Sequence, residues 1–236
     1  MLHSVSRRLF LAGVTGSFAL RSYSWEEAAV PTTLDHILLG CDNLDRGIKF
    51  VEERTGIRAA YGGVHPGRGT RNALLSFGER HYLEIIAPDP NQSDLKQHSD
   101  IREMSTPRLI GWAVHPGDLN ALAEKLRAAR LAFAGPYPGS RKRPDGRVLN
   151  WKSLALADDR HGLLPFFIEW SADSIHPATD APAGCRLQHF GIAGPDPEQL
   201  SGFMRLIGIE APVEPGEKAE LRALIVGPKG DLEARS

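Results

Sequence analysis

The sequence predicts an α+β fold in which two βαβββ modules follow one another and a partial third βα unit ends the chain. Three observations support this prediction. Short apolar runs bounded by turn residues are typical of strands, and capped segments with one apolar face are typical of helices. The same order of strands and helix occurs twice, as in repeat architectures. The 24 Gly and 17 Pro residues among 236 supply the turns that many short elements need.

The first module is expected over 34–90. Its opening segment is apolar enough for a buried strand, and Asp42 or Asn43 is a suitable N-cap for the helix that follows. Gly56 is the expected end of that helix. The expected elements are, in order, a strand over 34–41, the helix, a glycine-rich segment over 61–69, and strands over 72–77 and 81–87.

The second module repeats this order over 108–171. The expected elements are a strand over 109–115, a helix over 119–130 capped by Asp118, a Pro- and Gly-rich loop over 135–146, and strands over 148–156 and 164–170. A shift of 75 residues superposes the two helix starts, and a shift of 85 superposes the two final strands. Because one such unit alone would expose an apolar sheet face, the repeat predicts two modules packed together.

The remaining segment, 172–236, is interpreted as a linker and a partial third module packed on the same domain. Residues 187–192 resemble 34–39, with His189 at the position of His36, and a helix over 197–206 and a strand over 221–226 follow. The role of His189 is left open, because the third unit is incomplete.

The N-terminal segment 1–29 is interpreted as an export leader rather than as part of the fold. Ser6-Arg7-Arg8-Leu9-Phe10-Leu11 resembles the bacterial twin-arginine signal, and the apolar stretch over 9–20 is too short to span a membrane. We therefore expect the twin-arginine export machinery to be a partner and the location to be periplasmic or otherwise extracytoplasmic. An N-terminal extension with a chance arginine pair is the alternative, and two cleavage positions remain open.

The charge balance excludes several classes of partner. The chain has 28 Lys and Arg against 29 Asp and Glu, a net charge of −1, whereas nucleic acids and anionic membranes attract basic proteins. Two cysteines make neither a disulfide scaffold nor a cysteine zinc site, and whether Cys41 and Cys185 pair is open. No phosphate loop or dinucleotide motif stands out, so no nucleotide cofactor is expected.

Paired modules with a histidine in the first strand and a glutamate in the last strand resemble the vicinal-oxygen-chelate superfamily, and more narrowly its glyoxalase-like branch. The segments that bear the resemblance are 34–37, 65–72, 82–86, 144–146 with Trp151, and 165–170. The resemblance implies a cupped half-barrel from each module, with a ligand and a metal held between them. Members of the superfamily include isomerases, extradiol dioxygenases and metal-free binding proteins, so the fold does not choose among activities.

The resemblance implies a single divalent metal ion, Mn²⁺, Fe²⁺ or Zn²⁺, at His36, Glu84 and the second module's equivalent glutamate, Glu169. One imidazole and two carboxylates suit such ions, and Glu84 or Glu169 is also the candidate general base. The second module has Gly111 at the position of His36, so one ligand of the full pattern is missing. The alternative is a hydrogen-bonded core histidine beside glutamates that line a wet cavity.

Substrate contacts are expected from three places. His65, Thr70 and Asn72 follow glycines that permit close approach to a small ligand, although these side chains also suit a loop tied down by its own hydrogen bonds. Arg143, in a loop with three positive charges, is the candidate for binding a carboxylate or phosphate. Trp151 is a candidate apolar wall, and a core tryptophan would have the same pattern.

The sequence therefore predicts an exported glyoxalase-like protein, with a metal-dependent enzyme that acts on a small carbonyl- or oxygen-rich molecule as the first hypothesis. Lyase, isomerase and dioxygenase reactions remain open. A metal-free protein of the same fold that binds or sequesters a small molecule is the alternative. A homodimer is also left open, because repeated modules can pair across subunits.

Overall fold

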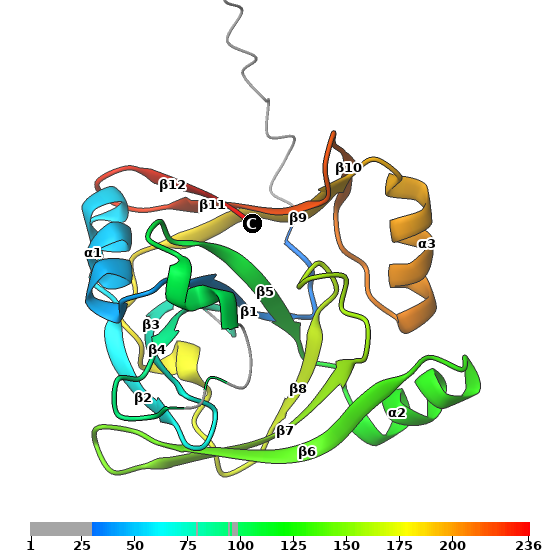
Figure 1. Cartoon of the computed structure of the whole chain (residues 1–236), viewed down its shortest axis with the longest axis horizontal. Helices are drawn as coiled ribbons and strands as arrows, with labels where there is room; N and C mark the ends of the chain where they lie inside the picture. The colour runs from blue at the N-terminus through cyan, green and yellow to red at the C-terminus, as the bar shows by residue number, and fades with distance from the viewer. Residues whose placement is uncertain (1–29, 79, 94, 96–98) are drawn as a thin grey trace, which may run out of the picture.

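The computed structural model describes residues 30–78, 80–93, 95 and 99–236, so the predicted leader over 1–29 lies outside the described residues. The α+β prediction with tandem βαβββ modules is confirmed (Figure 1). The first module consists of β1 (Leu34–Gly40), α1 (Leu44–Thr55), β2 (Ala60–His65), β3 (Thr70–Ser76) and β4 (Tyr82–Pro88). The second consists of β5 (Arg108–Val114), α2 (Leu119–Ala128), β6 (Phe133–Lys142), β7 (Val148–Leu156) and β8 (Phe166–Trp170).

Both helices begin where their N-capping residues predict, and α1 also ends as predicted, whereas α2 ends at Ala128 rather than at residue 130. The Asn43 side chain accepts a hydrogen bond from the Arg46 N–H (3.0 Å), and α1 ends at Gly56, whose φ of 84° is left-handed. Asp118 accepts hydrogen bonds from two N–H groups at the start of α2. Each helix then buries its apolar face against the sheet.

The two modules form a single eight-stranded sheet in the order β2-β3-β4-β1-β5-β8-β7-β6. The first strands of the modules, β1 and β5, pair in antiparallel fashion at its centre, whereas β1–β4 and β5–β8 are parallel pairs. The edge strands β2 and β6 also contact each other, so the sheet curls into an almost closed barrel (Figure 1).

Two segments expected to be loops are strands. The glycine-rich segment 61–69 includes β2, and most of the Pro- and Gly-rich segment 135–146 is β6. Both strands lie at edges of the sheet. An edge strand tolerates Pro and Gly because one side of its backbone has no ladder to complete, which explains why composition alone indicated loops.

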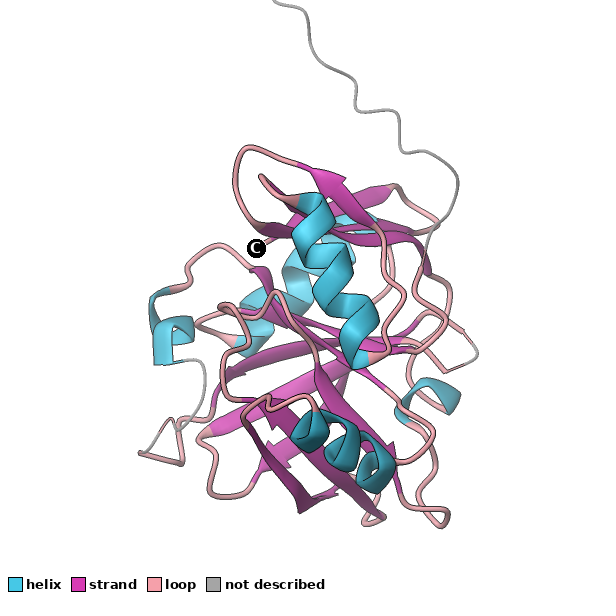
Figure 2. Ribbon diagram, turned by 90° about the vertical axis from the view of Figure 1, so that its right-hand side faces the viewer, coloured by secondary structure: helices cyan, strands magenta, loops and turns pink. Residues whose placement is uncertain are grey.

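The C-terminal unit differs from the partial third module that the sequence predicts. It contains β9 (Arg186–Gly194), α3 (Pro197–Ile207), β10 (Val213–Pro215), β11 (Glu220–Val226) and β12 (Asp231–Arg235). These strands form a separate four-stranded sheet in the order β10-β9-β11-β12. This sheet lies at the top of the molecule in Figure 2. Because β9 lies between β10 and β11, the sheet has an order of its own rather than that of the βαβββ modules. Two short 3-10 helices, η1 (Ser99–Glu103) and η2 (Pro177–Thr179), lie in the connections.

Strand alternation separates the core from the interior of the barrel. In β1, Ile37 and Leu39 face the hydrophobic core that the large sheet shares with the C-terminal unit, while His36 and Leu38 face the barrel interior. Trp112 of β5 packs against Phe190 of β9 with ring centroids 5.1 Å apart, which joins the C-terminal unit to this core. The interior face of the large sheet is therefore the surface available to a ligand.

The structure also shows the state of the two cysteines and the character of the helices. Cys41 and Cys185 are both buried and free, so they do not pair. Within residues 30–78, 80–93, 95 and 99–236, no helix combines the length and the apolar content that a membrane crossing requires.

Candidate functional site

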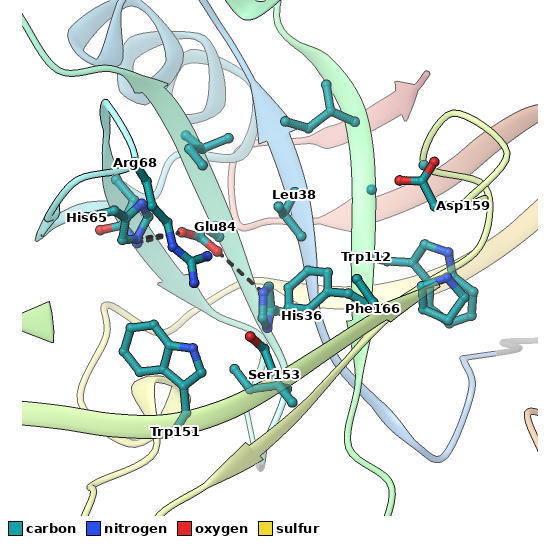
Figure 3. Close-up of a pocket in the computed structure, with 18 of the residues that line it drawn as sticks. His36, Leu38, His65, Arg68, Glu84, Trp112, Trp151, Ser153, Asp159 and Phe166 are labelled. Atoms are coloured by element: carbon teal, nitrogen blue, oxygen red, sulfur yellow. Dashed lines mark hydrogen bonds and ion pairs between the residues drawn. The ribbon is translucent and has the colours of Figure 1, made fainter. Parts of the chain in front are cut away.

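The barrel encloses a cavity of about 460 Å³ between the two modules (Figure 3). Its walls come from β1, β3 and β4 of the first module and from β5 to β8 of the second. Polar side chains gather on the first module's side, and aromatic side chains gather on the second. A cavity of this size with a few polar groups on apolar walls is typical of a site for a small molecule.

His36 and Glu84 meet at the base of this cavity. They project from the adjacent parallel strands β1 and β4, and His36 Nε2 lies 3.4 Å from Glu84 Oε2. The exposed fractions are 2% for His36 and 7% for Glu84. The two residues that the sequence pairs are therefore in contact, and both are nearly removed from solvent.

Asp35 binds the other nitrogen of His36. Its Oδ1 lies 2.7 Å from His36 Nδ1, while its Oδ2 accepts from Trp170 Nε1 (3.0 Å) and lies 3.1 Å from His176 Nε2. Neighbouring strand residues normally face opposite ways, but a shift in the β1–β5 register between Leu34 and His36 brings these two side chains together. Asp35 is not predictable from the sequence, because strand alternation separates adjacent positions. His176 precedes a 3-10 helix in the connection after β8, where no strand pattern applies.

The charges in this cluster stabilise one another. Burial would lower the pKa of His36, but hydrogen bonds to Asp35 and Glu84 outweigh burial and raise it to about 9. Burial would raise the pKa of each carboxyl. The histidines beside them outweigh that effect, so the pKa values of Asp35 and Glu84 both lie well below their ordinary ranges. At neutral pH the cluster is an imidazolium between two carboxylates.

His65, Thr70 and Asn72 also come together, beside Glu84. Asn72 Nδ2 donates to Glu84 Oε1 (2.6 Å), and His65 Nε2 lies 3.4 Å from the same oxygen. His65 Nδ1 is 2.8 Å from Thr70 Oγ1. Burial lowers the pKa of His65 to about 4, so its ring is neutral at neutral pH.

Arg141 completes the cluster from the second module. Its guanidinium donates to Asn72 Oδ1, and only 3% of the residue is exposed. This contact fixes the Asn72 amide so that its NH₂ group points at Glu84. Arg141, rather than the predicted Arg143, reaches the cavity from the basic segment, because β6 extends to Lys142 and turns Arg141 toward the barrel.

Arg143 does not line the cavity. It lies in the turn beyond β6, where its Nη1 is 2.7 Å from Asp180 Oδ1 and its Nε is 3.5 Å from Asp145 Oδ2. Its prediction as the residue that binds an anionic substrate is therefore wrong. An ordinary ion-paired turn accounts for it.

Glu169 also lies outside the cavity. Phe166, Ile168 and Trp170 of β8 face the interior, so Glu169 faces the other way. Its Oε2 accepts from the Leu119 N–H (2.9 Å) at the start of α2. Carboxylates are favoured at a helix N-terminus, which accounts for the residue without a catalytic role.

The register of β8 against β5 explains why Glu169 does not occupy the position of Glu84. His36 pairs with Tyr82 in the first module, and Ala113 pairs with Phe166 in the second. Two residues beyond Tyr82 is Glu84, whereas two residues beyond Phe166 is Ile168. A shift of one residue moves a side chain to the opposite face of a strand, and the alignment of sequence motifs was displaced by that one residue.

The residues present do not fit the predicted metal ion. Within residues 30–78, 80–93, 95 and 99–236, no three His, Cys, Asp or Glu side chains are arranged to hold one. Both nitrogens of His36 lie against carboxylates, Gly111 offers no side-chain donor, and Glu169 caps α2. His189 lies in the C-terminal sheet, 3.2 Å from Glu214, and does not replace the missing ligand. Positive charge beside Glu84 comes instead from the protein's own side chains.

Trp151 lines the second module's side of the cavity, as the sequence predicts. Its ring centroid is 5.5 Å from that of Trp170, at an interplanar angle of 55°. Opposite Trp151 on β6 is Gly139, where a Cβ atom would lie 2.5 Å from the indole. The glycine therefore lets this ring lie close against the neighbouring strand.

Comparison with known proteins now places the chain in a family. A family model described as a glyoxalase-like domain matches residues 34–206. The chain belongs to the glyoxalase-like domain family. This match confirms the resemblance seen in the sequence and extends it from the paired modules to α3. A comparison with curated protein sequences finds no match.

Comparison with solved structures finds several similar chains, and the first described here shares the fold of this glyoxalase-like domain. A hypothetical protein from Staphylococcus aureus has a TM-score of 0.59 and 18% sequence identity, over 86% of this chain and 84% of that one. A variant of the Streptomyces coelicolor methylmalonyl-CoA epimerase, in complex with 2-nitronate-propionyl-CoA, has a TM-score of 0.46 and 22% identity, over 62% of this chain and 99% of that one. The methylmalonyl-CoA epimerase from Mycobacterium tuberculosis has a TM-score of 0.40 and 19% identity, over 60% and 89%. Identities this low concern the fold alone.

Proposed function

We propose that this glyoxalase-like protein is an enzyme that transfers a proton to and from a small carbonyl-containing molecule bound in the barrel. The observation that supports this most strongly is Glu84, a carboxylate that is only 7% exposed, is ionised at neutral pH and lines a cavity of about 460 Å³. Ionisable groups held in a cavity by specific partners are candidates for catalytic groups.

Glu84 is the proposed general base. Its carboxylate takes a proton from the carbon next to the carbonyl group, and the electron pair of that C–H bond moves onto the carbonyl oxygen to give an enolate. The low pKa makes Glu84 a weak base but keeps it fully ionised. At neutral pH every protein molecule therefore has a carboxylate that can accept the proton. Return of the proton to the carbon completes an exchange or isomerisation without any other reactant.

The surrounding groups position this base and stabilise charge. Asn72 holds one carboxylate oxygen and His36 faces the other. Arg141 places a fixed positive charge beside the site where negative charge develops on the substrate, which is the arrangement that lowers barriers most effectively. No three side chains of the described residues are arranged to hold the predicted metal, so we write these steps with the chain's own residues.

The test is hydrogen–deuterium exchange at carbon. Small 2-oxo acids and other carbonyl compounds are incubated with the protein in D₂O after treatment with EDTA, and loss of the C–H signal is followed by proton NMR. We expect exchange above the buffer rate, and a decrease of ~100-fold or more in Glu84→Gln, the usual size of a general-base contribution. Glu169→Gln is the matched control, because that carboxylate caps α2, and it should exchange at the wild-type rate.

Two results would contradict the proposal. Equal exchange by wild type and Glu84→Gln would remove Glu84 from the reaction. An exchange rate that appears only after addition of Mn²⁺, Fe²⁺ or Zn²⁺ would restore the metal-dependent hypothesis of the sequence analysis.

Binding without turnover is the second candidate function. It is favoured by the way in which Asp35, His36, Glu84, Asn72 and Arg141 already satisfy one another, as structural networks do. It predicts that a ligand raises the melting temperature while no carbon-bound proton exchanges, and that Glu84→Gln keeps this stabilisation.

We further propose that residues 1–29 direct export by the twin-arginine route, to the periplasm or another extracytoplasmic location. The support is the Arg7-Arg8 pair before a short apolar stretch. Residues 1–29 fused to a reporter protein should deliver it out of the cytoplasm of a bacterium, and replacement of both arginines by lysine should stop delivery. A reporter that stays in the cytoplasm with the native arginines would refute the proposal.

A further inference from the structure

Arg68 offers the cavity a positive charge that no carboxylate of the described residues neutralises. It lies in the turn between β2 and β3, and its half-buried side chain lines the cavity on the same side as His65 and Glu84 (Figure 3). Among residues 30–78, 80–93, 95 and 99–236, no carboxylate lies within ion-pair distance of its guanidinium. A half-buried arginine without an acidic partner is available to a ligand.

The other ionisable groups on this side of the cavity contact one another. His36 lies between Asp35 and Glu84, and Glu84 accepts a hydrogen bond from Asn72, which Arg141 holds. Among the described residues Arg68 has no such acidic partner, and its charge lies in a region of low dielectric, where charge interactions are strong. Asp159, the remaining acid of the lining, lies across the cavity and is exposed (Figure 3).

Arg141 is a second, independent indication that the cavity binds a hydrogen-bond acceptor. The residue is 3% exposed, and its Nε has no hydrogen-bond partner among the residues that the structure describes. Its one side-chain hydrogen bond in this part of the chain goes to the neutral amide oxygen of Asn72. A buried N–H group without an acceptor lowers the stability of the protein. The second module therefore also brings to the cavity a hydrogen-bond donor, Arg141 Nε, that a ligand could satisfy.

An apolar wall faces these two cations. The indole of Trp151 stands across the cavity from Arg68 (Figure 3), and Gly139 behind it leaves the ring close against β6. Phe166 and Trp170 continue the aromatic surface. A flat apolar group would remove this surface from water, while its polar end reached the arginines.

We propose that the ligand of this cavity is a small monoanion in which a carboxylate that binds Arg68 is attached to a flat apolar carbon body that stacks on Trp151. This inference rests on the proposed function, because it names the substrate class of the same cavity. The planar guanidinium pairs with both oxygens of a carboxylate, and one negative charge suits Arg68, which has no acidic partner among the described residues. The cavity volume of about 460 Å³ limits the ligand to a small molecule.

The experiment compares two probes of the same shape. Phenylacetate and phenylacetamide differ in charge but little in size, and their affinities are measured by isothermal titration calorimetry at neutral pH. We expect wild type to bind phenylacetate ~10-fold or more tightly than the amide, since a charge-assisted hydrogen-bonded pair exceeds a neutral one by ~1.4 kcal/mol or more. Acetate should bind more weakly than phenylacetate, because it lacks the group that stacks on Trp151.

Variants at Arg68 and Trp151, with a control at Arg186, show which side chains cause the preference for the carboxylate. Arg68→Gln should lose the preference for the carboxylate, and Arg68→Lys should keep part of it. Arg186→Gln is the matched control, because it removes the same charge from an exposed position on β9 whose side chain contacts Gln188, and it should keep the full preference. Trp151→Leu should weaken both aromatic probes by a similar factor. Unchanged melting temperatures of the variants verify that each is folded.

The result that overturns the inference is equal binding of the two probes by wild type, or no binding of either. Inorganic phosphate that competes as well as phenylacetate would also overturn it, since the site would then select any anion. Because binding needs no turnover, the outcomes separate the two proposals. A carboxylate preference without carbon-bound exchange refutes only the enzyme, whereas exchange without the preference refutes only the ligand class.

Discussion

Glu84 shows how one buried carboxylate acquires its properties from its neighbours. Asn72 and Arg141 fix one oxygen, while His36, itself held by Asp35, provides the opposite charge at the other. Removing any of these partners would leave an uncompensated buried charge, which costs far more than the contact contributes. At the scale of the residue, the protein has organised positive charge around a base without relying on a metal ligand set.

This cluster predicts how stability depends on pH. The pKa of His36 is raised from 6.5 to about 9, so the stabilisation by its bound proton is complete below pH 6.5 and is lost as the pH rises through 9. The pKa of His65 is lowered to about 4, so between pH 6.5 and 4 the unfolded chain takes up the extra proton and stability falls as the pH decreases. We expect the free energy of unfolding in urea to be largest near pH 6.5.

The variant His36→Gln distinguishes the alkaline side from the acid side of this dependence of the free energy of unfolding on pH. The variant should lose the decline on the alkaline side, which amounts to on the order of 3 kcal/mol in wild type. The decline on the acid side should remain, because His65 and the carboxylates cause it. An alkaline decline of the same size in both proteins would show that another group is responsible.

At the scale of the element, helix caps and strand alternation could be predicted. Which residues of a short strand face the barrel interior could not. The caps at Asn43 and Asp118 and the apolar runs placed the helices and the inner strands correctly. Glu169 was misassigned because β8 has large apolar residues on both faces, so its sequence gives no preferred phase. Only pairing with β5 shows that Ile168 faces inward.

The contact between β2 and β6 depends on one glycine. Gly63 has a φ of 139°, and a Cβ atom there would lie 2.8 Å from the Lys142 carbonyl oxygen on β6. We expect Gly63→Ala to lower the free energy of unfolding by ~2 kcal/mol or more, because it adds a steric clash to backbone strain. Gly67→Ala is the matched control, since its φ of 69° is also left-handed but no atom lies within 4 Å of the added Cβ.

The measurement is urea denaturation of both variants. The control should lose only the cost of the backbone conformation, ~1 kcal/mol. Equal losses in the two variants would mean that the contact between the edge strands contributes nothing beyond backbone strain. Weaker binding of phenylacetate by Gly63→Ala alone would link this contact to the shape of the cavity.

At the scale of the whole molecule, the C-terminal sheet completes the core of the barrel. Its strands could be predicted as short apolar runs, but their order could not, because β10 contains only three residues and the choice of its partner depends on packing. The same limit applies to the site. His36, Glu84, His65 and Asn72 came from motifs. Asp35 and Arg68 lie in the same motifs but were not chosen as site residues, and Arg141 reaches the cluster through a contact between modules that no local pattern encodes.

Phe190 tests this packing. It is fully buried on β9 against Trp112 of β5. Phe190→Ala should lower the free energy of unfolding by ~3–5 kcal/mol, the range for large aromatic side chains in a core. Ile175→Ala, at a 42% exposed position in the connection before β9, should change it by less than ~0.5 kcal/mol. A small effect of Phe190→Ala would show that the C-terminal unit packs loosely on the barrel.

The central claim is that an imidazolium–carboxylate pair, rather than a metal ion, provides the charge at Glu84. Nitrogen-15 NMR of the histidine rings, recorded against pH and with and without Zn²⁺, tests this claim most directly. The account predicts that His36 remains doubly protonated at neutral pH and titrates near pH 9, that His65 remains neutral, and that Zn²⁺ changes neither. A His36 ring that is neutral at pH 7 and shifts on addition of stoichiometric Zn²⁺ would contradict the claim.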